Sequence, residues 1–166
     1  MDHTFAVRRA GASARLQMRA VRSADMPFID AMVARLFPLT GPGDYTLEEA
    51  CAGTRRVLHA AISEARADAL FEIAHDERGE CAGFIYAVTV SSFFTAEPHA
   101  HISEIVAARD RSGAGRVMMA RAEDWSRERG YRRITLNVMH TNAGARAFYE
   151  RLGYNLEVHR LTKLLG

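Results

Sequence analysis

The sequence predicts a single α/β domain, a twisted mixed β-sheet of about six or seven strands flanked by about four helices. Three observations lead to this class. The 166 residues suit one domain with a sizeable core. Two apolar runs that alternate like strands are joined by a short turn at residues 76–79. Residues 101–154 then read, in order, as strand, glycine loop, helix, strand and capped helix.

The first residues predict an arm outside the core. Residues 1–14 are rich in alanine and arginine, contain one acid, Asp2, and show no clear amphipathic stripe. We therefore expect a flexible arm over residues 1–15 and a folded domain over residues 16–166. A weak transit peptide is the alternative interpretation of the arm.

One strand and two helices are predicted next. Residues 16–22 alternate as a strand, and Pro27 suits the first turn of the helix that follows. A loop at residues 38–44, with Gly41-Pro42-Gly43, separates this helix from a second one over residues 47–65. The buried faces of the two helices are predicted by apolar residues at helical spacing: Phe28, Met32, Leu36, Phe37, Ala50, Val57, Leu58 and Ile62.

The strands predicted over residues 69–74 and 81–90 form a hairpin. Both faces of the second strand are apolar, which is typical of a central strand covered on both sides. Residues 91–98 form a loop in which the adjacent Phe93 and Phe94 cannot both face the core.

The C-terminal half contains the longest continuous pattern. A strand is predicted over residues 102–107, and the next helix has an apolar stripe formed by Met118, Ala122 and Trp125. Gly130 ends that helix. The remaining elements are a strand over residues 132–139, a helix over residues 143–151 capped by Asn142, and a last strand over residues 156–161.

Composition excludes several classes of protein. The net charge of +2 is too small to indicate a nucleic-acid partner. No apolar run approaches the roughly 18 residues of a membrane helix. The two cysteines, Cys51 and Cys81, match neither a metal-binding spacing nor a disulfide framework, so we expect a cytoplasmic setting.

The loop formed by Asp110, Arg111, Ser112, Gly113, Ala114 and Gly115 has the chemistry of an anion site. Its glycines allow close approach of the backbone, and the first N–H groups of the following helix have no intrahelical partner. Arg111 and Arg116 add positive charge at the same helix end. A phosphate or pyrophosphate suits this loop, although glycines at this spacing also form ordinary turns.

Together with Asn142, Ala145, Tyr149 and the Gly153-Tyr154 pair, this loop resembles the GNAT superfamily of acyl-CoA-dependent N-acyltransferases. The family order is strand, (Arg/Gln)-x-x-Gly-x-(Gly/Ala), helix, strand and Asn-x-x-Ala-x-x-x-Tyr-x-x-x-Gly-(Phe/Tyr). The resemblance covers the C-terminal two-thirds of the chain well and the N-terminal third loosely. It implies a GNAT-like fold with acetyl-CoA as the acyl donor. We expect no metal, because His99 and His101 lack a third ligand at a recognisable spacing.

The resemblance also implies roles for individual residues. Tyr149 would protonate the departing sulfur, and Asn142 would hydrogen-bond the cofactor arm. Backbone groups near Ile105 and Val106 would bind that arm and polarise the thioester. The remaining cofactor-binding residues would be Arg111, Ser112, Gly113, Ala114, Gly115 and Arg116.

One position departs from the family pattern. Asp110 stands where the family usually has Arg or Gln, and a carboxylate facing a pyrophosphate would repel it. Either Arg109 or Arg111 takes the role in a shifted loop, or Asp110 turns outward.

Several residues are candidates for the general base. Glu104 is the one carboxylate within the predicted strand over residues 102–107, and a solvent-facing glutamate is the alternative. His99 and His101, two apart, would share a face of that strand and titrate in a useful range. Glu97 is a further acid, and His140 is expected to be a polar loop residue.

These patterns favour an N-acetyltransferase that transfers the acetyl group of acetyl-CoA to a primary amine of a small molecule, by direct attack in a ternary complex. We expect Phe93 or Phe94 to line the acceptor pocket or an oligomer contact. A protein or peptide acceptor and a non-catalytic acyl-CoA sensor are the alternatives. We expect no nucleic-acid or membrane partner, and a homodimer is left open by analogy.

Overall fold

A computed structural model of the protein describes residues 15–37, 44–163 and 165. The chain divides into two compact units, Met1–Leu136 and Asn137–Gly166. The arm expected over residues 1–15 lies outside the described residues except for Arg15, as does the loop expected over residues 38–44 except for Asp44.

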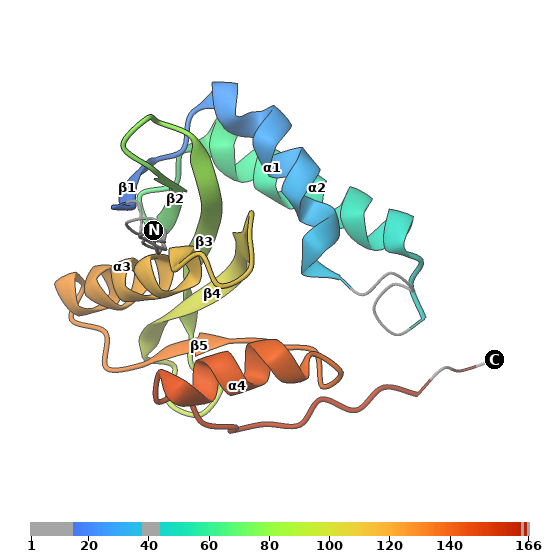
Figure 1. Cartoon of the computed structure of the whole chain (residues 1–166). Helices are drawn as coiled ribbons and strands as arrows, with labels where there is room; N and C mark the ends of the chain where they lie inside the picture. The colour runs from blue at the N-terminus through green and yellow to red at the C-terminus, as the bar shows by residue number, and fades with distance from the viewer. Residues whose placement is uncertain (1–14, 38–43, 164, 166) are drawn as a thin grey trace, which may run out of the picture. The chain divides into compact units, whose positions relative to one another are not determined.

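The first unit is built on a five-stranded sheet in the order β1-β2-β3-β4-β5 (Figure 1). Neighbouring strands are antiparallel from β1 to β4, and β5 is parallel to β4. The sheet is therefore mixed, as predicted, and its five strands are fewer than the six or seven expected. The strands are β1 (Gln17–Ala20), β2 (Ala69–His75), β3 (Cys81–Ser91), β4 (Pro98–Ala107) and β5 (Ile134–Leu136).

Helices cover the two faces of this sheet. The helices α1 (Met26–Val33) and α2 (Leu47–Glu64) lie on one side, and α3 (Ala114–Glu128) lies on the other (Figure 1). Short 3-10 turns, η1 (Ser23–Asp25) and η2 (Ala34–Leu36), flank α1. Within the described ranges, none of the helices combines the length and the apolar character that crossing a membrane requires.

Each side of the sheet has its own apolar contacts. The predicted stripe of α3, Met118, Ala122 and Trp125, is buried. A Cβ atom on Gly83 would lie 2.5 Å from the backbone oxygen of Val106 and 3.0 Å from the Met118 Cε atom, so β3 needs a glycine there. The core on the side of α1 and α2 consists of Ile29, Val33, Cys51, Leu58, Ile73, Phe84, Tyr86 and Val106.

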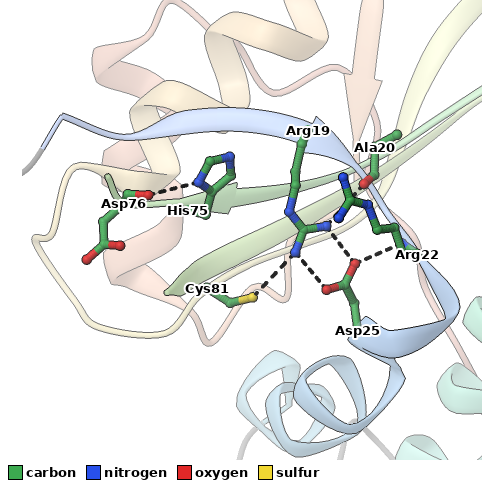
Figure 2. Close-up of polar contacts among 7 residues, drawn as sticks. All are labelled: Arg19, Ala20, Arg22, Asp25, His75, Asp76 and Cys81. Atoms are coloured by element: carbon green, nitrogen blue, oxygen red, sulfur yellow. Dashed lines mark hydrogen bonds and ion pairs between the residues drawn. The ribbon is translucent and has the colours of Figure 1, made fainter. Parts of the chain in front are cut away.

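A paired carboxylate fixes the corner between β1 and η1 (Figure 2). Asp25 is 7% exposed, and both of its oxygens accept hydrogen bonds of 2.7 Å from the Arg19 guanidinium. The backbone N–H of Arg22 donates a further bond of 2.8 Å to the same carboxylate. The hydrogen bonds from Arg19 are the main reason that the pKa of Asp25 lies below its usual value. This buried charge is therefore fully compensated.

Two strand predictions in the C-terminal part need correction. The strand expected over residues 132–139 is reduced to the three residues of β5. The last strand expected over residues 156–161 is irregular chain, with Leu156, Val158 and Leu161 exposed. Alternating apolar residues form a strand only when a neighbouring strand pairs with them, and no described strand pairs with this segment.

Candidate active site

An extra residue in the middle of β4 determines which way Glu104 faces. Tyr86 of β3 pairs with Glu104, but the next residue, Ala87, pairs with Ile102, so Ser103 forms a β-bulge. Directly paired residues of antiparallel strands share a face of the sheet. Glu104 therefore lies on the Tyr86 side, which α1 and α2 cover, whereas unbroken alternation would place it on the side of α3.

The Glu104 carboxyl group is partly buried and lacks a charge partner. No described residue forms an ion pair or a hydrogen bond with it, and burial raises its pKa to about 7. About half of these groups are therefore ionised at neutral pH. Such a carboxylate can accept a proton from an amine, which a glutamate of ordinary pKa does less readily.

The pairing of β4 with β5 stops close to Glu104. Parallel pairing with β5 covers Ala100–Ile102 and ends where Ile102 meets Leu136. On that edge, the backbone from Ser103 to Ala107 forms no ladder with β5. This open segment includes Ile105 and Val106, whose backbone groups the family resemblance assigns to the cofactor arm.

The loop after β4 leads into an uncapped helix. Gly113 is the N-cap residue of α3, its φ angle of 87° favours glycine, and it has no side chain to cap the helix. The recorded side-chain contact at this end is a long one, 3.4 Å from the Ala114 N–H to Ser112 Oγ. The N–H groups of Gly115 and Arg116 belong to the same first turn, where helical bonds are absent and the dipole is positive.

Three arginines flank this helix end. Arg109, Arg111 and Arg116 are exposed, and Arg111 adopts a φ angle of 56°, an unusual value for a residue other than glycine. Strained backbone of this kind concentrates at functional sites. Positive side chains and first-turn amides thus coincide at the start of α3.

Asp110 does not face this helix start as an unpaired charge. Its side chain is 90% exposed and accepts a hydrogen bond of 2.8 Å from the Arg35 guanidinium. The charge that departs from the family pattern is therefore compensated by an ion pair.

The two histidines of β4 share the face of Glu104. His99 pairs with Val90 and His101 with Val88, on the Tyr86 side of the sheet. The Nδ1 atom of His101 lies 2.9 Å from Thr135 Oγ1, and burial, with a smaller contribution from His99, lowers the pKa of His101. His99 is 8% exposed, and its Nδ1 atom has no hydrogen-bond partner among the described residues.

Three other candidates from the sequence lie at the β3–β4 turn, away from Glu104. Phe93 and Phe94 are 95% and 70% exposed at the β3–β4 turn, and they pack edge-to-face on each other. Six residues, about 20 Å of strand, separate Pro98 at this turn from Glu104. Glu97 lies in the same turn, so the structure does not bring these three side chains beside the Glu104 carboxylate. His140, in the second unit, is an exposed turn residue.

The second unit contains the other half of the sequence motif. Asn142 caps α4 (Ala143–Arg151), because its Oδ1 atom accepts a hydrogen bond of 3.0 Å from the Ala145 N–H. The Tyr149 ring lies 5.4 Å from that of Phe148 and 6.1 Å from that of Tyr154. Burial raises the pKa of Tyr149, so its phenol stays protonated at neutral pH.

Two features of this region were not expected from the sequence. Arg35 lies 75 residues before Asp110, and no local pattern links the two. The bulge at Ser103 is the second feature, and the composition of the strand does not indicate it.

Among the described residues, no group of three or more His, Cys, Asp and Glu side chains is arranged to hold a metal ion.

A family model described as Acetyltransferase (GNAT) family matches residues 39–154. The chain belongs to the GNAT family. This is a family of acetyltransferases, and membership confirms the resemblance that the glycine loop and the Asn142–Tyr154 motif indicate in the sequence. Among curated proteins, none matches this GNAT chain.

Solved structures support the GNAT fold. A GCN5-related N-acetyltransferase from Ralstonia eutropha JMP134 is 18% identical, with a TM-score of 0.71 over 92% of this chain and 100% of its own. The aminoglycoside antibiotic 6'-N-acetyltransferase AAC(6')-Ih from Acinetobacter baumannii is 15% identical, with a TM-score of 0.68 over 92% of this chain and 100% of its own. The aminoglycoside N-acetyltransferase AAC(6')-Iy in complex with CoA is 15% identical, with a TM-score of 0.64 over 96% of this chain and 98% of its own.

Proposed function

We propose that this protein transfers the acetyl group of acetyl-CoA to a primary amine of a small molecule, by direct attack in a ternary complex. The observation that supports this most strongly is the Glu104 carboxylate, which is partly buried, has no partner among the described residues and has a pKa of about 7. It lies beside the open edge of β4, where the family binds the acyl donor. A non-catalytic sensor would have no need of a carboxylate that the fold leaves uncompensated.

In this proposal the donor is held by backbone groups. The first-turn amides around Gly113, with Ser112, Ala114, Gly115, Arg111 and Arg116, bind the diphosphate. The open edge at Ile105 and Val106 pairs with the pantetheine arm like an added strand. Asn142 adds a hydrogen bond to that arm, as the family motif implies.

The chemistry then needs a base and an acid. Glu104 accepts a proton from the ammonium form of the substrate, directly or through water, so that the nitrogen lone pair can attack the thioester carbon. As the C–N bond forms, the C–S bond breaks, and the Tyr149 phenol gives its proton to the departing sulfur. The second proton, which the nitrogen loses on becoming an amide, returns through water to the Tyr149 phenolate. The raised pKa of Tyr149 keeps that proton available at neutral pH.

A small amine is favoured over a peptide because several proteins of similar structure are aminoglycoside acetyltransferases by name. The identities of about 15% support the fold and leave the choice of acceptor to experiment. We place the reaction in the cytoplasm, since Cys51 and Cys81 are both free thiols. Phe93 or Phe94 remains a candidate contact for the acceptor or for a second subunit.

Two measurements test the proposal. Isothermal titration calorimetry should detect CoA binding to the purified protein, and a free-thiol assay should detect acetyl transfer in a panel of small amines and peptides. Absence of CoA binding at millimolar ligand would refute the proposal. CoA binding without thiol release from any acceptor would favour the sensor, and release with peptides alone would favour a protein acceptor.

Tyr149→Phe separates the acid role from a packing role. The variant keeps the ring contacts and loses only the hydroxyl group, so turnover should fall about 100-fold or more while the Kd for CoA changes little. Equal losses in turnover and affinity would argue that Tyr149 only positions the cofactor.

A further inference from the structure

The ion pair between Arg35 and Asp110 shows how the loop before α3 tolerates a carboxylate. We infer that Arg35 is a cofactor-binding residue: held by Asp110 and by the Ala107 carbonyl, its guanidinium contacts the diphosphate of coenzyme A. The inference rests on the proposed function and deepens it, because it adds a residue from the segment after α1 to the same site.

The guanidinium is anchored on two sides. Its Nε–H donates a hydrogen bond of 3.2 Å to the backbone oxygen of Ala107, the last residue of β4. Its Nη2 donates a bond of 2.8 Å to Asp110 Oδ1. Both partners flank the start of the loop that ends at Gly113. The side chain is thus ordered before any ligand arrives, which lowers the entropy cost of binding.

Donors remain on this guanidinium. An arginine has five N–H groups in a planar fork, and two of them are used in these bonds. No described residue accepts a hydrogen bond from the other three. With 42% of its side chain exposed, Arg35 can donate them to a phosphate oxygen in a charge-assisted bond.

Charge explains why the loop needs this residue. Residues 109–116 contain three arginines and one aspartate, a net charge of +2, and Arg35 raises the local charge to +3. The family usually has Arg or Gln at the position of Asp110. Here Asp110 recruits the missing cation from a segment 75 residues earlier, so the site regains the charge that its own loop lost.

The test compares CoA with pantetheine, which lacks the phosphates, by calorimetry. Arg35→Ala should raise the Kd for CoA about tenfold, because a charge-assisted bond is lost and Asp110 is left unpaired. Its Kd for pantetheine should equal that of the wild type. An unchanged Kd for CoA, or the same loss for both ligands, would overturn the inference.

A double variant separates contact with the phosphates from simple neutralisation of Asp110. Asp110→Ala removes one anchor of Arg35 together with the negative charge, and its Kd for CoA is the reference for the double variant. The double variant Asp110→Ala with Arg35→Ala should bind CoA about three- to fivefold more weakly than Asp110→Ala alone. If the double variant binds CoA as tightly as Asp110→Ala, Arg35 only neutralises the aspartate and the inference fails.

Arg66 provides the matched control. It forms a 2.7 Å ion pair with Asp68, at similar side-chain exposure, just before the start of β2. The start of β2 pairs with Val88 of β3, which in turn pairs with His101. Ala107, the backbone anchor of Arg35, pairs with Gly83, five residues away from Val88 along β3. Arg66→Ala should therefore leave the Kd for CoA unchanged.

If wild-type protein binds no CoA, the proposed function fails. If wild-type protein binds CoA and only the results for the Arg35 variants disagree, this inference alone fails.

Discussion

Asp25, at the β1–η1 corner, and Glu104, at the bulge of β4, are two carboxylates withdrawn from water in the same unit of the protein. Asp25 accepts three short hydrogen bonds, and its pKa is lowered (Figure 2). Glu104 accepts none from the described residues, and its pKa is raised to about 7. The comparison shows that burial acts differently on two carboxylates of one unit: compensated burial stabilises a corner, and uncompensated burial raises the pKa of the carboxylate that we propose as the base.

Glu104→Gln should produce the largest effect. Glutamine keeps the size of the side chain and cannot accept the proton, so kcat should fall by at least about 100-fold. Steady-state kinetics with the best acceptor would measure this. Asp25→Asn is the matched control at the other carboxylate, and folded protein of that variant should retain its kcat. Wild-type turnover in Glu104→Gln would remove Glu104 from the mechanism.

Asp25→Asn should have the larger effect on stability. The change leaves the Arg19 guanidinium in a partly buried position without a counter-charge, so the free energy of unfolding should fall by about 2 kcal/mol at pH 7. Urea denaturation followed by circular dichroism would measure it. Because the pKa of Asp25 is lowered on folding, its stabilisation is complete above the ordinary aspartate value and is lost as the pH falls below about 4. The two proteins should therefore converge in stability in acid, and a constant difference down to pH 2 would contradict this account.

The pH dependence of turnover should follow the ionisation of Glu104. The base must be ionised, so kcat at saturating acceptor should rise about tenfold between pH 6 and pH 8, with a midpoint near the Glu104 pKa of about 7. The residual activity of Glu104→Gln should lack this rise. A rise that persists in the variant would assign the titration to another group, and His101 is the nearest alternative on the same strand face.

The smallest expected effect is a gain in the stability of Glu104→Gln above neutral pH. Burial raises the pKa of Glu104, so this group's contribution to stability is most favourable at low pH, where it is neutral, and is lost as the pH rises through about 7. Above pH 7 the native state holds a poorly solvated charge. Glu104→Gln should then unfold at higher urea than the wild type at pH 8, by about 1 kcal/mol. At pH 4 the difference should disappear. A destabilised variant at pH 8 would mean that the carboxylate has a stabilising partner.

Local patterns in the sequence predicted much of this fold. The stripe of Met118, Ala122 and Trp125, the helix stop at Gly130 and the Asn142 cap each depend on residues a few positions apart, and the structure contains all three. The GNAT family followed from two such motifs in combination.

The features that the sequence did not predict depend on distant partners. The run from Leu156 to Leu161 alternates like a strand, but a strand also needs a neighbour, and alternation carries no information about one. The bond from Arg35 to Asp110 joins two charged residues 75 positions apart, and any of the exposed arginines could have been the partner. Of the candidate site, the loop and Glu104 were therefore predictable, while the anchoring of Asp110 was not.

The added residue at Ser103 has a consequence for reading related chains. It shifts the phase of β4 by one, so His101 and Glu104, three positions apart, present their side chains on one surface of the sheet. An alignment that places a gap on the wrong side of Ser103 would assign residues to the opposite face of the sheet. Relatives of this protein should therefore be aligned on the bulge at Ser103, and a carboxylate in the neighbouring alignment column should not be taken for the equivalent of Glu104.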